Sequence, residues 1–194
     1  PKQKICLFEH LSMSVPPRDV IVIEACVLSL ASNVKQPYYL QKAKDWLQNF
    51  GTLTLSAIHS SADIRIENNL NDDLNKQTPN TPVYFNQVAY LAFAQPMDYW
   101  QWLQLTKNFE QQQDRLLYQK PAVTLDIDII AVKCLHQIDN IDQSLDEKGN
   151  RFVLFAKSAN QWLGIRRRFP LACYDQVGIV DLSKNIDLSF IRSF

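Results

Sequence analysis

Two aspartates separated by one residue are the strongest chemical signal in the sequence, in the segment from Thr124 to Ile129 (TLDIDI). Alternate residues of a β-strand point to the same face, so Asp126 and Asp128 would share a face with their Cα atoms about 6.6 Å apart. Two such carboxylates repel each other unless a cation or a basic group lies between them. Hard cations such as Mg²⁺ bind one or two carboxylates and complete their shell with phosphate oxygens and water. The pair therefore indicates a metal site, or else the exposed face of an edge strand.

Three further groups of residues could contribute to a site. Tyr84 and Asn86 are also two residues apart on a predicted strand, where a ring beside an amide could bind a flat heterocycle; an ordinary strand surface is the alternative. Glu110 and Arg115 end a predicted helix just before the aspartate strand, and could equally be a solvated helix end. The arginine run 166–168 could hold phosphates through guanidinium forks, or could be a solvated turn.

The elements that would position these residues follow from the apolar periodicity. In chain order we predict a central strand over 20–30, a helix over 38–50 that Pro37 opens and Gly51 ends, a strand over 52–66, a polar loop over 67–81, a strand over 83–94, a helix that Pro96 opens, and a strand over 123–132. This order is that of a ferredoxin-like α/β sandwich, an α+β fold with helices packed on an antiparallel sheet. Segments 151–156 and 173–182 are predicted to be short extended pieces. We expect a lead-in over 1–19 and a single domain over 20–194.

Composition excludes several classes of protein. The chain has 194 residues and only four glycines, all far apart, so it contains neither a P-loop nor a dinucleotide-binding glycine motif. Lysine plus arginine equals aspartate plus glutamate at 20 each, which argues against a broad nucleic-acid surface. The four cysteines form no C-x-x-C pair, which argues against a zinc site and against thioredoxin-type redox chemistry. The apolar stretch 20–31 is too short to span a membrane. We expect a cytoplasmic monomer that binds neither nucleic acid nor membrane.

Four short segments, in the right order, resemble the 6-hydroxymethyl-7,8-dihydropterin pyrophosphokinase family over residues 20–132. Ala31-Ser32-Asn33 resembles the family's Gly-Ser-Asn after the first strand. Segment 82–86 (PVYFN) resembles its Tyr-x-Asn pterin strand, and segment 109–115 (FEQQQDR) resembles its Ile-Glu-x-x-x-Gly-Arg. Segment 124–129 is close to its Thr-Leu-Asp-Leu-Asp-Ile metal motif, the most specific of the four.

The resemblance implies a ferredoxin-like fold and transfer of pyrophosphate from ATP to the pterin hydroxymethyl group, with release of AMP. It implies two Mg²⁺ ions on Asp126 and Asp128. The other implied roles are pterin binding by Tyr84, Asn86 and Phe169, nucleotide contact by Glu110, and a catalytic contact of Arg115 with the phosphates. We expect Lys120 to act with Arg115 as a catalytic point charge that compensates in part for arginines missing from the loop.

The sequence also departs from the family pattern. Between Arg115 and Asp126 the family has further arginines, whereas here only Lys120 is basic, and Val123 stands where an arginine precedes the threonine. The family's His-containing stretch and its Asn-Arg-x-Phe segment have Arg168-Phe169 as their nearest counterpart. We therefore expect reduced turnover, and two alternatives stay open. One is a non-catalytic relative that binds pterin or nucleotide, and the other is a ferredoxin-like module that binds RNA.

Overall fold

The computed structural model describes residues 20–62, 83–115, 117–118, 122–136, 152–154 and 161–193. The lead-in over 1–19, the loop over 67–81 and Lys120 therefore lie outside the described residues. In chain order the elements are β1 (Val22–Ser32), α1 (Gln36–Leu47), β2 (Gly51–Leu55), β3 (His59–Ala62), β4 (Val83–Asp98), α3 (Tyr99–Gln112), β5 (Asp126–Cys134), β6 (Phe152–Leu154), β7 (Trp162–Ile165), the 3₁₀ turn η3 (Arg166–Arg168), α4 (Cys173–Leu182) and the 3₁₀ turn η4 (Ser189–Ser193).

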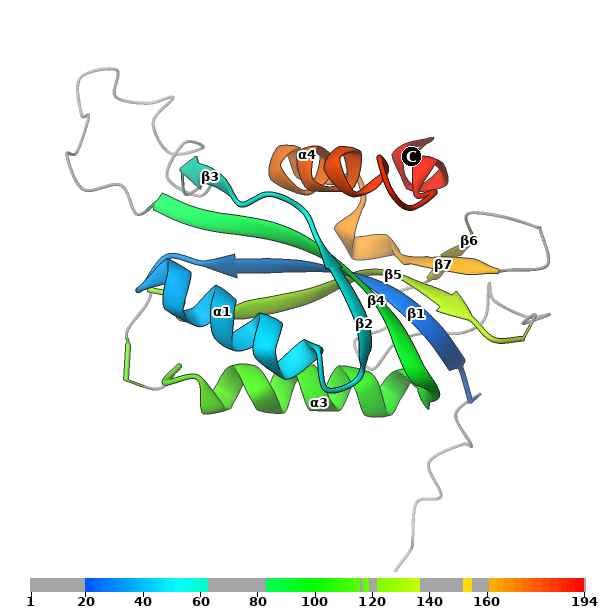
Figure 1. Cartoon of the computed structure of the whole chain (residues 1–194), viewed down its shortest axis with the longest axis horizontal. Coiled ribbons are helices and arrows are strands. Elements are labelled where there is room, and N and C mark those ends of the chain that lie inside the picture. The colour runs from blue at the N-terminus through cyan, green and yellow to red at the C-terminus, as the bar shows by residue number, and fades with distance from the viewer. Residues whose placement is uncertain are drawn as a thin grey trace, which may run out of the picture.

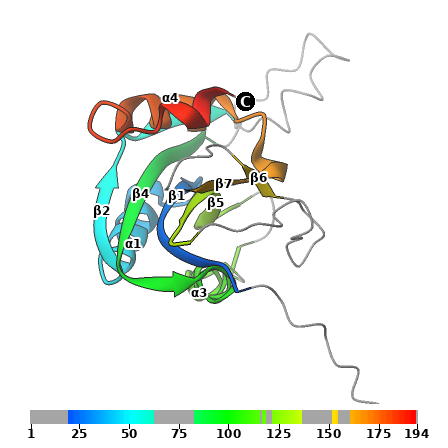
Figure 2. The same cartoon turned by 90° about the vertical axis from the view of Figure 1, so that its right-hand side faces the viewer.

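The strands form one antiparallel sheet with the order β2-β4-β1-β5-β7-β6, and β3 also pairs with β4. The elements β1, α1, β2, β4, α3 and β5 form a βαββαβ unit. Its strands lie in the order β2-β4-β1-β5, which is the ferredoxin-like arrangement. Helices α1 and α3 lie on one face of the sheet and α4 lies on the other (Figures 1 and 2). The predicted α+β sandwich is confirmed, with β1 as a central strand.

Each face of the sheet carries its own apolar core. On the α1/α3 face, Leu28 and Ile127 from the strands pack with Tyr39 and Trp102 from the helices. On the α4 face, residues from the strands pack with Ile179 and Leu182 of α4; they are Val27, Val88 and Ile130. Cys26 is fully buried in the first core. The sheet is thus covered on both sides, and polar residues on it are held in place by packed neighbours.

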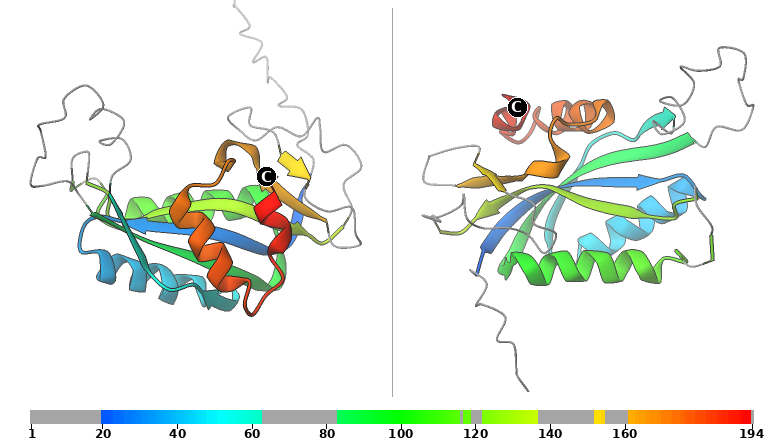
Figure 3. Two further views of the ribbon diagram at one scale, coloured as in Figure 1. Left: turned by 90° about the horizontal axis from the view of Figure 1, so that it is seen from above. Right: turned by 180° about the vertical axis from the view of Figure 1, so that it is seen from behind.

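Helix α4 corrects the predicted extended segment 173–182. Its buried residues, Asp175, Gly178, Ile179 and Leu182, recur at helical spacing. The β-branched residues that favoured a strand, Val177 and Val180, are on its exposed side. The helix is seen over the sheet in both views of Figure 3.

Two element boundaries also differ from the prediction. Pro96 does not open α3; it is exposed within β4, where the pairing with β1 shifts between Ile23 and Ala25. A proline is tolerated at such a bulge because no ladder hydrogen bond is needed there. Asp98 begins the helix instead, since its side chain accepts hydrogen bonds from the backbone of Trp100 and Gln101.

The described part of the predicted strand 52–66 is likewise divided into β2 and β3, both paired with β4, and residues 63–66 lie outside the described residues. Within the described residues, no helix is long and apolar enough to cross a membrane.

Candidate functional site

Asp126 and Asp128 lie on the α4 face of the sheet. Leu125, Ile127 and Ile129 belong to the core on the opposite face, so the aspartates between them point away from α1 and α3. This alternation was predicted from the sequence and is confirmed.

Tyr84 and Asn86 lie on the same α4 face as the aspartates. Val88, two residues further along β4, is buried in the α4-side core, and alternate strand residues share a face. Asn86 pairs with Ala31 of β1, and Ala31 in turn pairs with Asp126 of β5. Asn86 and Asp126 are therefore two strand spacings apart, about 10 Å between Cα atoms. The fold thus brings two predicted groups that are 40 residues apart in sequence into one row across the sheet.

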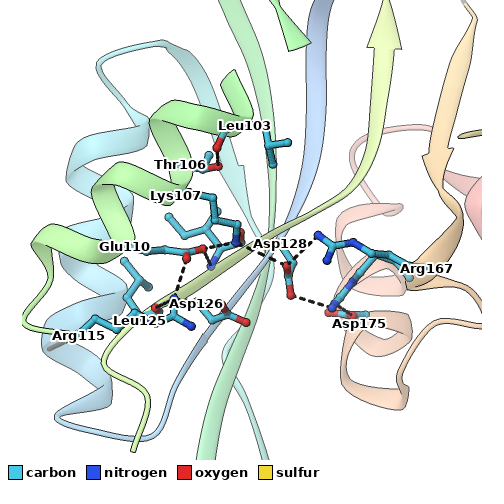
Figure 4. A network of polar contacts seen from close by, with 12 residues as sticks. Leu103, Thr106, Lys107, Glu110, Arg115, Leu125, Asp126, Asp128, Arg167 and Asp175 are labelled. Carbon is cyan, nitrogen blue, oxygen red and sulfur yellow. Dashed lines mark hydrogen bonds and ion pairs between the residues drawn. The ribbon is translucent and has the colours of Figure 1, made fainter. Parts of the chain in front are cut away.

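Asp128 is surrounded by three basic side chains. Its Oδ2 lies 2.8 Å from Nη1 of Arg168, and its Oδ1 lies 3.8 Å from Nζ of Lys107 and 3.9 Å from Nη2 of Arg167 (Figure 4). The bond from Arg168 is a charge-assisted hydrogen bond, whereas the other two contacts are longer ion pairs. Both oxygens of Asp128 thus face positive charge supplied by the chain itself.

Arg168 bridges Asp128 to a second carboxylate, Asp175 of α4. Nη2 of Arg168 donates to Oδ2 of Asp175 over 2.7 Å, and Oγ of Ser29 donates to the other oxygen, Oδ1. Asp175 is only 1% exposed. Burial raises the pKa of Asp175, while the guanidinium of Arg168 opposes that rise. One side of the site is therefore a series of contacts that runs from the buried Ser29 and Asp175 to the partly exposed Arg168 and Asp128.

Asp126 is the less enclosed of the two aspartates. Its side chain is 34% exposed, and among the described residues Nη1 of Arg115 lies 3.5 Å from its Oδ1. Burial raises the pKa of Asp126, and the negative charge of Asp128 raises it further. Of the pair, Asp126 has the carboxylate that a solvent-borne ligand could reach.

Glu110 of α3 forms a hydrogen bond with the edge of strand β5. It is 2% exposed. Its Oε1 accepts from Nζ of Lys107 and from the backbone N–H of Ile127, and its Oε2 accepts from Nη1 of Arg115. Burial raises the pKa of Glu110, and Lys107 opposes that rise. Each oxygen of Glu110 thus already has a partner, so in this conformation it positions Lys107 and Arg115 beside the aspartates.

Lys107 and Glu110 contact a stretch of the β5 edge that has no described strand beside it. Strand β7 pairs only with Ala131 to Lys133, so no described strand pairs with the outer edge of residues 126–130. Lys107 donates to the carbonyl of Ile127, and Glu110 accepts from the N–H of the same residue. Side chains of α3 thereby replace the missing strand neighbour.

The remaining predicted ligand residues are placed as follows. Asn86 is 3% exposed and donates through Nδ2 to Oγ of Ser61, 2.8 Å away, and to the carbonyl of His59, 3.4 Å away. Tyr84 is half-buried on the same face. Phe169 packs against the α4-side core.

Sequence reasoning missed part of this site. Within the arginine run, the solvated-turn interpretation is wrong for Arg168, whose side chain is 19% exposed and doubly paired. Asp175 was hidden by the wrong assignment of 173–182, although its spacing to Ile179 and Leu182 is helical. Lys107 precedes Glu110 by three residues, the spacing of a helical ion pair, and that was the available signal.

The charges of the described residues in the site cancel. Four carboxylates contact four basic side chains: Glu110, Asp126, Asp128 and Asp175, with Lys107, Arg115, Arg167 and Arg168. The described residues contain no group of three or more His, Cys, Asp or Glu side chains that could hold a metal ion. Asp126 fits a hard cation whose other ligands would come from phosphate and water. Asp128, as it stands, does not fit one.

No family model matches the chain, and no curated protein matches it either.

Proposed function

We propose that the protein transfers the terminal diphosphate of ATP to 6-hydroxymethyl-7,8-dihydropterin and releases AMP. One observation carries the proposal: Asn86, Ala31 and Asp126 form a row across three adjacent strands. A flat heterocycle beside Tyr84 and Asn86 and a polyphosphate beside Asp126 would then share one face, about 10 Å apart. That is close enough for a hydroxymethyl group to meet a phosphorus atom.

The residues around Asn86, Ala31 and Asp126 would have different roles in binding the two substrates. Tyr84 would stack on the pterin ring, and Asn86 would hydrogen-bond its edge. Arg115, fixed by Glu110 and 3.5 Å from Asp126, would bind phosphate oxygens. Phe169 and Lys120 remain proposed contacts to pterin and phosphate. When bound, Mg²⁺ would neutralise charge on the polyphosphate; Asp126 would hold it, and Asp128 could join only after release from Arg168.

The reaction needs positioning and charge neutralisation more than covalent help. The pterin hydroxyl oxygen would attack the β-phosphorus and give up its proton to water. The bond between that phosphorus and the bridging oxygen of AMP would break, and AMP would leave with the bonding electron pair. We also propose that the protein works in the cytoplasm and as a monomer.

AMP release tests the function directly. The purified chain is mixed with ATP, Mg²⁺ and the pterin, and AMP is separated by chromatography, with a mixture lacking pterin as the blank. We expect pterin-dependent AMP from the wild type and a loss of about 100-fold or more in Asp126→Asn. Asp45→Asn is the matched control, because Asp45 is exposed on α1, and it should retain activity. Equal AMP from Asp126→Asn and the wild type would show that the site is wrongly placed.

A second candidate is a non-catalytic relative that binds pterin or nucleotide. The observation that favours it is the enclosure of Asp128 by Arg168, Lys107 and Arg167, which leaves one accessible carboxylate. Titration calorimetry distinguishes the two. Binding of ATP or pterin without any AMP release would select the non-catalytic candidate.

A further inference from the structure

We infer that Arg168 is the resident cation of the carboxylate pair and keeps divalent ions off Asp128 in the free protein. The inference deepens the proposed function, because it concerns the same aspartates and decides when a metal can bind them. It rests on contacts among described residues that come from three elements: β5, η3 and α4.

The position of Arg168 is fixed from two sides. Its Nη1 lies 2.8 Å from Asp128 and its Nη2 lies 2.7 Å from Asp175, so one planar guanidinium joins a strand carboxylate to a helix carboxylate. Figure 4 shows Asp128 and Asp175 facing each other across this junction. Ser29 of β1 holds the far oxygen of Asp175. Arg168 is therefore held by two carboxylates, those of Asp128 and Asp175.

A divalent ion at Oδ2 of Asp128 would have to displace this guanidinium, and an ion at Oδ1 would meet Lys107 and Arg167, 3.8 and 3.9 Å away. A metal ion and a guanidinium repel each other at such distances, so both cannot use the same carboxylate oxygen. Asp175 is 1% exposed, and if Arg168 moved away, the Ser29 hydroxyl would be the one hydrogen-bonding side chain left to it among the described residues. Leaving a buried carboxylate without its cation is strongly unfavourable. Asp175 thus holds Arg168 in place, and Arg168 in turn occupies Asp128.

The surrounding charge supports the same conclusion. Among the described residues, the four carboxylates of the site are balanced by four basic side chains, so these residues offer no net negative charge to attract a cation. Removal of Arg168 alone unbalances the site by one unit next to two adjacent aspartates. The cation selectivity of the pair is therefore set by a residue 40 positions away from Asp128.

Binding of Mn²⁺ alone, followed by the electron paramagnetic resonance signal of the free ion, tests the inference without nucleotide. We expect weak binding by the wild type and binding at least about tenfold tighter by Arg168→Met, which keeps an apolar stem and removes the charge. Arg166→Met is the matched control, since it removes the same charge from the same turn. Arg166 is exposed and forms no ion pair with the described carboxylates of the site, so its removal should change the affinity by less than about threefold.

Two further variants guard against a misfolded Arg168→Met. Asp175→Asn preserves shape but releases one side of Arg168, and it should also tighten Mn²⁺ binding. Asp128→Asn should leave the weak wild-type binding unchanged, because Asp128 is not a ligand in the free chain. Strong Mn²⁺ binding by the wild type that Asp128→Asn abolishes would overturn the inference, as would equal affinities of Arg168→Met, Asp175→Asn and the wild type. Failure of AMP release alone would refute only the proposed reaction.

Discussion

Replacement of Glu110 by alanine is the most informative test of how the site is supported. The variant removes a 2% exposed carboxylate that accepts hydrogen bonds from Lys107, Arg115 and the backbone N–H of Ile127. The resemblance gave Glu110 a nucleotide contact, whereas its position makes it a support for the edge of β5. If Glu110 only contacted nucleotide, its replacement would leave the stability of the ligand-free protein nearly unchanged. If it supports the edge of β5, its replacement lowers that stability.

The expected loss can be worked out from the three contacts. The N–H of Ile127 would be left buried without an acceptor, which costs about 1–3 kcal/mol. The side chains of Lys107 and Arg115 are 34% and 40% exposed, so water can solvate them, and each lost ion pair contributes no more than about 1 kcal/mol. We therefore expect the free energy of unfolding to fall by about 2–4 kcal/mol.

Urea unfolding, followed by the fluorescence of the buried Trp102, measures this loss. Glu110→Gln keeps an acceptor for the N–H of Ile127 and should lose less than Glu110→Ala. Gln104→Ala, at an exposed position of α3, should change stability by no more than about 0.5 kcal/mol. A loss in Glu110→Ala below about 1 kcal/mol would refute the edge-support role.

Three other predictions concern stability. The folded-state pKa of Asp126 is raised, so its favourable contribution is present below its unfolded pKa of 3.8 and is lost as pH rises through the folded pKa. Asp126→Asn should consequently be more stable than the wild type at pH 7, with a difference that shrinks as pH falls through the raised folded pKa and has closed below about pH 3.8 in urea titrations. Gly51→Ala would place a Cβ 2.0 Å from the carbonyl oxygen of Ala92, so thermal unfolding should show a loss of about 1–3 kcal/mol. Asp98→Ala removes the cap of α3 and should cost about 1 kcal/mol by the same measurement.

The part of the fold that could be predicted from sequence is the part with clear apolar periodicity. Strand β1, helix α1 and strand β5 were predicted close to their observed positions because each has one strongly apolar pattern and a terminal signal such as Pro37. Helix α4 could not be assigned from its residue types. Val177, Ile179 and Val180 favour a strand locally, and packing of Gly178 against Val88 decides for a helix.

The candidate site was only half visible in the sequence. The shared face of Asp126 and Asp128 follows from strand geometry alone. Their partners Arg168 and Asp175 lie about 40 residues further on, and only the tertiary fold brings them to β5. No local sequence pattern predicts a contact between residues that are so far apart in the chain. Whether the row of Asn86 and Asp126 binds pterin and nucleotide stays a prediction.

The side chains that cover the edge of β5 also bear on how copies of this chain behave together. A strand edge with free N–H and carbonyl groups is a template on which another chain can add a strand and begin to aggregate. Lys107 and Glu110 bond the polar groups of Ile127, and Arg115 lies beside the carbonyl of Leu125. An incoming strand would have to displace these charged groups and bury them against its own backbone. The charges that hold the aspartates in position therefore also protect the open side of the sheet against pairing between molecules.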